Sequence, residues 1–366
     1  MQAFANVEAD LQIRLILYSG TAVAHPESNR MSLSQRLVRL CVVALLGSVP
    51  LAGACRDSES DEAQFRPSPP ALTVPPPKEV LRLPKKAGSY RFAALGDMGR
   101  GDTWQYDVSK QMQAFHEEFP FDFVIMLGDN IYDGATPDDY HRKFELPYKP
   151  FLDDDIPFYA VIGNHDEPNQ PKYEPFHMGG ERYYTFKPKA PLLAKLTDND
   201  VQFFMIDTEN FDRPERDWLE REMGKSDARW KIPVFHRPIY TSGRYSLWAL
   251  WTRTSIEPTL VSHGVRFVLS GHEHFYERTK PQKGITYFIS GAGGSLRAHD
   301  IRPSNIMAAG FDTDYSFMLW EIAGDEAYYQ AISRAGASVD YGVIRREGGP
   351  EKARPAKDTD PRSASE

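Results

Sequence analysis

Five apolar segments of the chain each end in residues that can bind a metal or a phosphate. One of them, residues 123–127, runs directly into Gly128-Asp129-Asn130. A short apolar run that stops at such a cluster is typical of a buried strand whose carboxyl end carries functional side chains. The other four segments end at Gly96-Asp97, Gly163-Asn164-His165-Asp166, His236 and Gly271-His272-Glu273-His274. Most place a glycine just before the polar residue, which allows the backbone to turn tightly.

Among these polar endings and Tyr132, the candidate ligands are two carboxylates, one carboxamide, three or four imidazoles and one phenol. Hard oxygen ligands and borderline nitrogen ligands without a thiolate are the inventory of a site for two metal ions. Two cations about 3.5–4 Å apart neutralise phosphoryl oxygens and turn a bound water into hydroxide near neutral pH. The residues therefore point to hydrolysis of a phosphate ester, with one carboxylate bridging the ions.

The order of these motifs resembles the calcineurin-like metallophosphoesterase superfamily. Tyr132 after residues 128–130 resembles its purple acid phosphatase branch, which includes the tartrate-resistant acid phosphatase-like enzymes. The resemblance covers roughly Tyr90 to Ser333, and five motifs in a fixed order are far more specific than any one alone. It implies a first metal held by Asp97, Asp129, Tyr132 and His274, and a second held by Asp129, Asn164, His236 and His272.

Two further expectations concern these ligands. If residues 272–274 are extended, alternate side chains share a face, so His272 and His274 reach adjacent ions while Glu273 points away. A phenol, with a free pKa of about 10, ligates only beside a strongly acidic cation. We therefore expect Fe(III) at the Tyr132 site, with Fe, Zn or Mn at the second. The alternative is a packing tyrosine in a zinc or manganese enzyme.

Three residues are candidates for contact with the substrate. His165 is expected to face the substrate, to donate to a phosphoryl oxygen or to protonate the leaving group, with Asp166 setting its tautomer. The resemblance supports this role, because the Asn-His-Asp run recurs in the family as a catalytic unit. Purple acid phosphatases usually carry further histidines after the lone histidine ligand, whereas residues 240–245 contain none. Arg244 is the candidate for a phosphate clamp there.

The elements that must position these residues predict an α/β fold. Strands alternate with helices and finish in antiparallel strands, which indicates two packed mixed β-sheets flanked by helices, the four-layer metallophosphoesterase sandwich. A helix with Trp104, Val108, Met112 and Phe115 on one face follows the first strand. Asp212 and Pro214 mark a helix start. Further expected elements are strands at 182–186 and 201–206, a helix at about 255–262 and a hairpin pairing 317–322 with 327–332.

The N-terminal region resembles an export signal. A cationic lead at 32–39 precedes an apolar run at 40–51 that is too short to span a bilayer, followed by Ala52-Gly53-Ala54 and Cys55. Cys55 would become the lipidated first residue of a bacterial lipoprotein, or the chain would simply be secreted after the same cleavage. Met31 is the expected working start. We divide the chain into an extension and signal peptide (1–54), a proline-rich linker (55–87), the metallophosphoesterase domain (88–345) and a disordered tail (346–366).

The composition is that of an ordinary globular protein, with 41% hydrophobic and 12% aromatic residues in 366. The net charge is -8, and no lysine-arginine stripe lies beside the motifs, so we expect no nucleic-acid substrate. The expected function is dinuclear metal-dependent hydrolysis of phosphate monoesters by a metal-bound hydroxide, outside the cytoplasm, on small esters or phosphorylated residues. The alternatives are a phosphodiesterase or nucleotidase with the same site, or a non-catalytic metal-binding lipoprotein.

Overall fold

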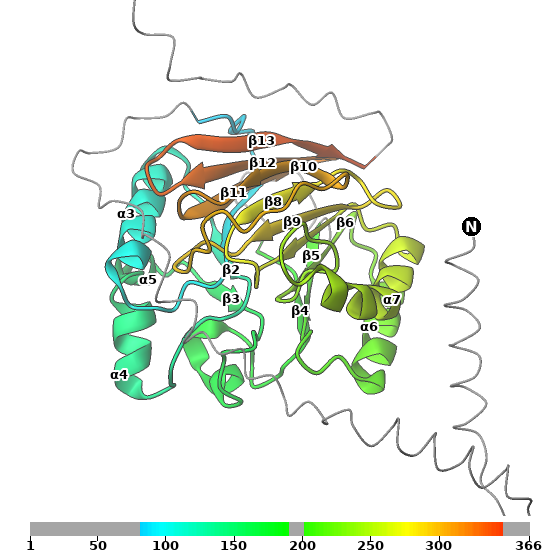
Figure 1. The fold of residues 1–366 in the computed structure, drawn as a ribbon, viewed down its shortest axis with the longest axis horizontal. Helices are drawn as coiled ribbons and strands as arrows, with labels where there is room; N and C mark the ends of the chain where they lie inside the picture. The colour runs from blue at the N-terminus through cyan, green and yellow to red at the C-terminus, as the bar shows by residue number, and fades with distance from the viewer. Residues whose placement is uncertain (1–80, 190–200, 347–366) are drawn as a thin grey trace, which may run out of the picture. The chain divides into compact units, whose positions relative to one another are not determined.

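The computed structural model describes residues 81–189 and 201–346 (Figure 1). All of the described residues belong to one compact unit of the chain. The predicted signal peptide, Cys55 and nearly all of the predicted tail lie outside the described residues. Within 81–189 and 201–346, no helix is long and apolar enough to cross a membrane.

Two mixed sheets form the centre of the described unit (Figure 1). The six-stranded sheet has the order β13-β12-β11-β1-β2-β3, with bounds Ser338–Arg345, Glu326–Ser333, Ser316–Ala323, Tyr90–Leu95, Phe123–Met126 and Phe158–Ala160. The seven-stranded sheet has the order β10-β8-β9-β7-β6-β5-β4, with bounds Met307–Phe311, Tyr276–Thr279, Thr286–Ser290, Phe267–Ser270, Trp230–Phe235, Val201–Ile206 and Tyr184–Phe186. Strands β1, β2 and β3 are parallel, as are β5, β6, β7 and β9. Their carboxyl ends therefore deliver residues to common edges.

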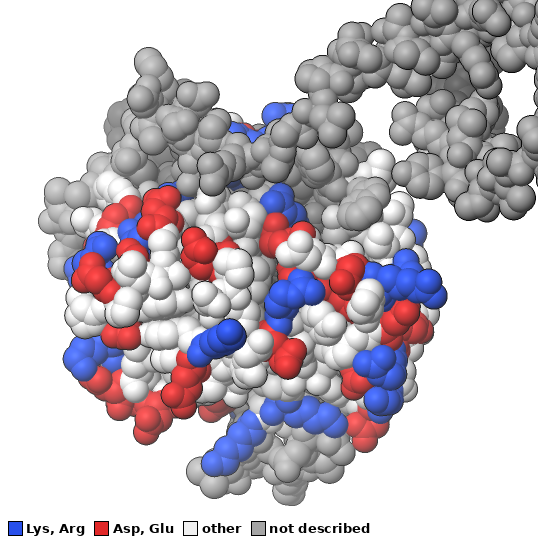
Figure 2. Space-filling model, turned by 90° about the horizontal axis from the view of Figure 1, so that it is seen from below, with Lys and Arg blue, Asp and Glu red and all other residues white. Residues whose placement is uncertain are grey.

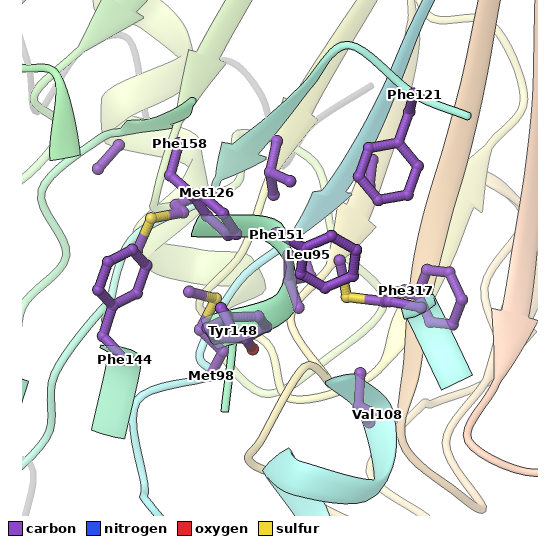
Figure 3. Packing of buried hydrophobic residues seen from close by; sticks show 14 of the residues in the cluster. Leu95, Met98, Val108, Phe121, Met126, Phe144, Tyr148, Phe151, Phe158 and Phe317 are labelled. Atoms are coloured by element: carbon purple, nitrogen blue, oxygen red, sulfur yellow. The ribbon is translucent and has the colours of Figure 1, made fainter. Parts of the chain in front are cut away.

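The sheets pack face to face because their strands alternate side chains between two apolar environments. On β1, Phe92 lies in the cluster between the sheets, where it stacks on Trp320 and meets Phe203 of the other sheet edge-on. Leu95, at the end of the same strand, points instead into a second cluster, on the outer face of the six-stranded sheet (Figure 3). In that cluster Val108 of α3 packs against the sheet. Because side chains alternate along each strand, the six-stranded sheet has an apolar cluster on both of its faces.

Helices cover both outer faces. On the six-stranded sheet these are α3 (Thr103–Glu118), the short α4 (Pro137–Tyr140) and α5 (Lys149–Asp153), with a π-helical turn at His141–Glu145. On the seven-stranded sheet α6 (Arg213–Lys225) and α7 (Ser246–Ser262) pack in a third apolar cluster. Short 3₁₀ turns occupy Gln170–Lys172 and Glu174–Phe176. The predicted α/β fold of two packed mixed sheets flanked by helices is confirmed.

Capping residues begin two of the helices, and the sequence predicted the one at Asp212. Asp102 accepts hydrogen bonds from the backbone N–H groups of Trp104 and Gln105, both at 3.1 Å, and begins α3. Asp212 accepts from the N–H of Glu215 at 3.0 Å and begins α6. Each carboxylate satisfies donors that have no partner within the helix and also lies at the positive end of the helix dipole.

The structure corrects several predicted elements. Helix α7 begins at Ser246, well before the expected 255. Strands β8, β10 and β13 were not predicted. Strand β8 lacks an apolar pattern because it contains the charged residues Glu277 and Arg278, which are buried. Both have partners: Glu277 accepts hydrogen bonds from Ser242, and Arg278 donates to Asp340. Residues 81–87, assigned to the linker, pack on the domain: Leu83 is buried, and the N–H of Lys85 donates to Glu321.

Candidate metal centre

The polar ends of five strands meet at one edge shared by the two sheets. The N–H of Asp97, after β1, donates to the carbonyl of Gly128, after β2, at 2.9 Å. The N–H of Gly271, after β7, donates to the carbonyl of His236, after β6, at 3.0 Å. The N–H of Gly96 bonds the carbonyl of Ser290 at 2.8 Å, which links the two groups across the sheets. Backbone bonds between distant segments thus bring the predicted ligands together.

Three of the ligand residues adopt left-handed backbone conformations. The φ angles are 55° at Asp97, 51° at Asp129 and 68° at His272, which side chains with a Cβ rarely adopt. Residues 272–274 are therefore not an extended segment, and that premise was wrong. Glu273 nevertheless points elsewhere: it accepts from Thr241 Oγ1 at 3.0 Å. A side chain at Gly163 would collide with the Asp129 carboxylate, because an added Cβ would lie 2.2 Å from its Oδ1.

The four residues expected to hold the first metal converge on the phenol oxygen of Tyr132. This oxygen lies 3.1 Å from Asp129 Oδ2, 3.3 Å from Asp97 Oδ1 and 3.3 Å from His274 Nε2. Ligand atoms of Asp97, Asp129 and His274 all lie within 4.8 Å of one another, and all three residues are buried. Two carboxylates, an imidazole and a phenol so arranged are a donor set that fits a cation.

The residues expected to hold the second metal are only partly arranged as ligands. His236 Nε2 lies 3.4 Å from Asp129 Oδ2 and 3.2 Å from Asn164 Oδ1. Its other nitrogen, Nδ1, lies 2.8 Å from the carbonyl of Leu127 and must donate to it, which leaves the Nε2 lone pair for a cation. The centroid of the His272 ring is 5.0 Å from that of the His236 ring. Nε2 of His272 faces the guanidinium of Arg237.

Burial and mutual charge shift the pKa values of these groups strongly. Burial raises the pKa of Asp97 well above its usual range, and it does the same for Tyr132, where both aspartates add to the effect. Burial opposes ionisation of Asp129 too, but the charge of His236 prevails and lowers the pKa of Asp129. Burial likewise disfavours the charged form of His236, yet Asp129 raises its pKa to about 10.

The two remaining imidazoles are held neutral. Burial, reinforced by nearby positive charges, lowers the pKa of His272 and His274 well below the usual value. A neutral imidazole and an ionised carboxylate are the forms that bind metal. In the absence of a cation, the proton on His236 compensates the charge of Asp129. A cation would take over that compensation.

His165 and Asp166 lie beside this cluster in different roles. The N–H of His165 donates to Asp129 Oδ1 at 2.9 Å, and its partly exposed ring lies 4.8 Å from the ring of Tyr132. The Asp166 carboxylate accepts from the N–H and side-chain amide of Asn130, and also from Gln170 Nε2 at 2.8 Å. Burial raises the pKa of Asp166 to about 7. Asp166 therefore ties together the loops that carry Asn130 and His165, and its effect on the His165 tautomer stays a prediction.

Arg244 is engaged in an ion pair. Its Nε and Nη2 donate to the two carboxylate oxygens of Asp300, at 2.9 and 3.2 Å, and its side chain is 24% exposed. Arg297, which is buried, faces the same carboxylate at 3.3 Å. A phosphate clamp would require Arg244 to leave Asp300. The structure therefore favours a role for Arg244 in holding its loop.

Sequence reasoning missed two arginines at the centre. The Arg100 guanidinium lies 3.7 Å from the ring centroid of Tyr132 and donates to Ser295 Oγ at 2.9 Å. Arg237 contacts His272 and also Glu209, whose two oxygens lie 2.9 and 2.8 Å from its Nε. Arg237 directly follows His236, which was the one available signal in the sequence. Nothing in the sequence pattern relates Arg100 to Tyr132.

A cavity of about 300 Å³ opens beside Asn164. Its walls include Asp166, Glu209 and Arg182. Arg182 pairs there with the buried Asp207, so charges of both signs line the space. The cavity adjoins the residues expected at the second metal, which places it where part of a substrate could lie.

Comparison with known proteins identifies the family to which the chain is related. The family model described as Calcineurin-like phosphoesterase matches residues 90–276, just over half of the chain. The chain is 23% identical over 305 residues to tartrate-resistant acid phosphatase type 5 of Homo sapiens, covering 71% of this chain and 94% of that protein. It is 27% identical over 268 residues to purple acid phosphatase 17 of Arabidopsis thaliana, covering 61% of this chain and 73% of that protein.

Two solved structures are similar in fold. One is described as the anchor in the inner membrane complex of Plasmodium, with a TM-score of 0.63 and 20% identity, covering 72% of this chain and 91% of that one. The other is a purple acid phosphatase from yellow lupin (Lupinus luteus) seeds, with a TM-score of 0.58 and 17% identity, covering 71% of this chain and 54% of that one. At these identities the likeness shows the fold.

Proposed function

Because the chain belongs to the calcineurin-like phosphoesterase family, in which it resembles the purple acid phosphatases, we propose that it hydrolyses phosphate monoesters with two bound metal ions. The resemblance inferred from the motifs is thereby confirmed, and the chain is a phosphoesterase. The dinuclear centre, the preference for monoesters and the location outside the cytoplasm are the parts that we propose.

The observation that carries the proposal is the position of the Tyr132 phenol. Its oxygen lies within 3.3 Å of a carboxylate oxygen of Asp97, a carboxylate oxygen of Asp129 and an imidazole nitrogen of His274. Burial, with the charge of Asp129 adding to it, raises the pKa values of Asp97 and Tyr132, so both groups resist ionisation when no cation is near. A cation among them would stabilise their ionised forms, and Fe(III) is the ion that we propose beside the phenol.

The residues of this chain would divide the remaining work. When bound, the two ions, with Fe, Zn or Mn at the second position, would supply Lewis acidity and lower the pKa of a coordinated water. Asp129 would be shared by both ions, and Asn164 and His236 would help to hold the second. His165, partly exposed beside the Tyr132 ring, would protonate the leaving alcohol.

The surroundings of the centre support a small ester as substrate. The cavity beside Asn164, of about 300 Å³, accommodates a compact leaving group. On the face shown in Figure 2, lysine and arginine side chains are interspersed with aspartate and glutamate among the described residues. This mixed surface supports small phosphate esters or single phosphorylated residues over a polynucleotide, which would favour a continuous basic track.

Export is proposed from the N-terminal sequence. The cationic lead, the apolar run 40–51 and the small residues before Cys55 precede the phosphoesterase domain, as in an exported bacterial protein. Cleavage before Cys55 would leave a terminal cysteine for a lipid anchor, or a secreted chain. N-terminal sequencing of the exported form tests this, and a mature chain that retains residues before Met31 would refute it.

Metal analysis and substrate comparison test the catalytic proposal. The purified mature protein should contain two metal ions per chain, show a tyrosinate-to-iron visible band and cleave a nitrophenyl monoester in preference to a nitrophenyl diester. Asp129→Asn should reduce turnover by on the order of a thousandfold, since it removes the bridging charge. A strong preference for the diester would instead identify the protein as a phosphodiesterase. An unchanged rate in Asp129→Asn would identify the activity as a contaminant.

A further inference from the structure

Arg237 makes a direct contact with one of the ligands expected at the second metal. Its Nη1 lies 3.1 Å from His272 Nε2, in a partly buried environment. Its Nε donates to both oxygens of Glu209, at 2.9 and 2.8 Å, and its backbone N–H donates to Thr208 Oγ1 at 2.9 Å. These contacts hold the guanidinium against the imidazole from two sides.

This contact determines which nitrogen of His272 carries the ring proton. A guanidinium has only donors, so His272 Nε2 must accept from Arg237. A neutral imidazole has a single acceptor nitrogen, and once Nε2 accepts, the ring proton is on Nδ1. In this arrangement neither nitrogen of His272 is available to a cation. His236 differs, because its Nδ1 donates to the Leu127 carbonyl and its Nε2 faces Asp129 and Asn164, where a cation would take the place of the proton.

Charge acts in the same direction as the hydrogen bond. A guanidinium in contact with His272 would repel a second cation bound by that imidazole, in a site where burial weakens screening by water. Glu209, only 13% exposed, compensates the charge of Arg237 and would retain the guanidinium if it moved away from His272. Glu209 also lines the cavity of about 300 Å³ beside Asn164, which leaves room for such a movement.

From this arrangement we propose that Arg237 competes with the second metal ion for His272, so that the two metals bind stepwise. The first ion binds the residues around Tyr132, and the second binds only when Arg237 releases His272 and rests on Glu209. This inference rests on the proposed two-metal function. It adds a residue of the chain that sets the affinity of the second ion, and Arg237 acts here as a positioning residue for His272.

The test is a calorimetric titration of the metal-free protein with Zn²⁺, combined with metal analysis of the stoichiometry. In the wild type we expect two binding steps with a weaker second step. Arg237→Met removes the donor and the charge and keeps most of the stem. It should strengthen the second step by roughly tenfold or more, because a hydrogen bond from a charged donor is lost as a competitor, and should leave the first step unchanged.

Two further variants separate competition from a structural role. The double variant Arg237→Met/Glu209→Gln keeps the net charge and leaves no unpaired carboxylate, so it guards against misfolding of the single variant. It should strengthen the second step as well. Glu209→Gln alone leaves the charge of Arg237 uncompensated beside His272 and should weaken the second binding step. If Arg237 and Glu209 merely hold the loop, the second step should instead be weaker in all three variants.

The outcomes distinguish this inference from the proposed function. A second step that is unchanged or weaker in both Arg237 variants, or that is absent in every protein, would overturn the competition. Failure of the wild type to bind any Zn²⁺ would instead overturn the proposed metal centre on which it rests.

Discussion

The phenol oxygen of Tyr132 lies 3.1 Å from Oδ2 of Asp129, the carboxylate expected to bridge two metals. Both side chains are buried, and burial raises the pKa of the phenol well above its usual value. A phenol in this position is neutral unless a strongly acidic cation is present. This contact therefore bears on the proposed metal at the first position and on the proposed charge-transfer band.

Tyr132→Phe tests the phenol as a ligand. It should abolish the visible charge-transfer band and weaken the first metal by at least about tenfold, since even outer partners of metal ligands contribute that much. The measurements are the visible spectrum and the metal content. Tyr159→Phe, on β3 with its ring stacked on Phe186, is the matched control and should leave both unchanged. A band that persists in Tyr132→Phe would remove the phenol from the ligand set.

His165→Asn tests protonation of the leaving group. The variant should lose about 10²–10⁴-fold in kcat on alkyl phosphates. Its loss on a nitrophenyl ester should be much smaller, because a nitrophenolate leaves without a proton. The control is His141→Asn, an exposed histidine paired with Glu145 away from the centre. Equal losses on both esters would assign His165 to phosphate binding rather than to acid catalysis.

The stability of the metal-free protein should fall as the pH rises above neutral. The pKa of His236 is about 10 in the folded protein, above the ordinary 6.5. A raised pKa means that the stabilisation is complete below about pH 6.5 and is lost as the pH approaches 10. Between pH 6 and pH 9 the loss should be on the order of a few kcal/mol.

Urea unfolding of the metal-free protein at these two pH values measures this effect. His236→Asn lacks the titrating imidazole and should lose distinctly less stability over the same interval. The same pH dependence in both proteins would mean that His236 is not protonated beside Asp129.

Arg100→Met tests the cation over the Tyr132 ring. The Arg100 guanidinium lies 3.7 Å from the ring centroid and lowers the pKa of the phenol against the larger effect of burial. Its loss should shift the visible band, because the positive charge over the ring favours the ionised phenol. Arg91→Met removes an arginine from above Phe119, away from the centre, and serves as the control. An unaltered band would assign Arg100 to packing alone.

Arg244→Met distinguishes a loop anchor from a phosphate clamp. As an anchor through Asp300, Arg244 should contribute about 1–3 kcal/mol to the free energy of unfolding, while KM changes by less than about threefold in its absence. Asp300→Asn breaks the same pair from the other side and should behave alike. A large rise in KM in the Arg244 variant alone would restore the clamp.

The sequence alone determined which strands end in candidate ligands and in what order. Apolar runs that stop at Gly-Asp or Gly-His are local features, and so are the Asp102 and Asp212 caps, because a strand or a cap depends on neighbouring residues. The same local logic failed for β8, where buried Glu277 and Arg278 find partners far away in sequence. It also assumed an extended backbone at His272, where the chain turns with a positive φ.

Only the tertiary structure decided how the ligands are tuned. Arg100 reaches the Tyr132 ring, and Arg237 reaches His272 and Glu209, through contacts made when two sheets pack and their strand ends meet. Such contacts join side chains from separate segments and leave no periodicity in the sequence. The composition of the centre is therefore local information, whereas its charge balance and the availability of each ligand depend on the packing of the whole domain.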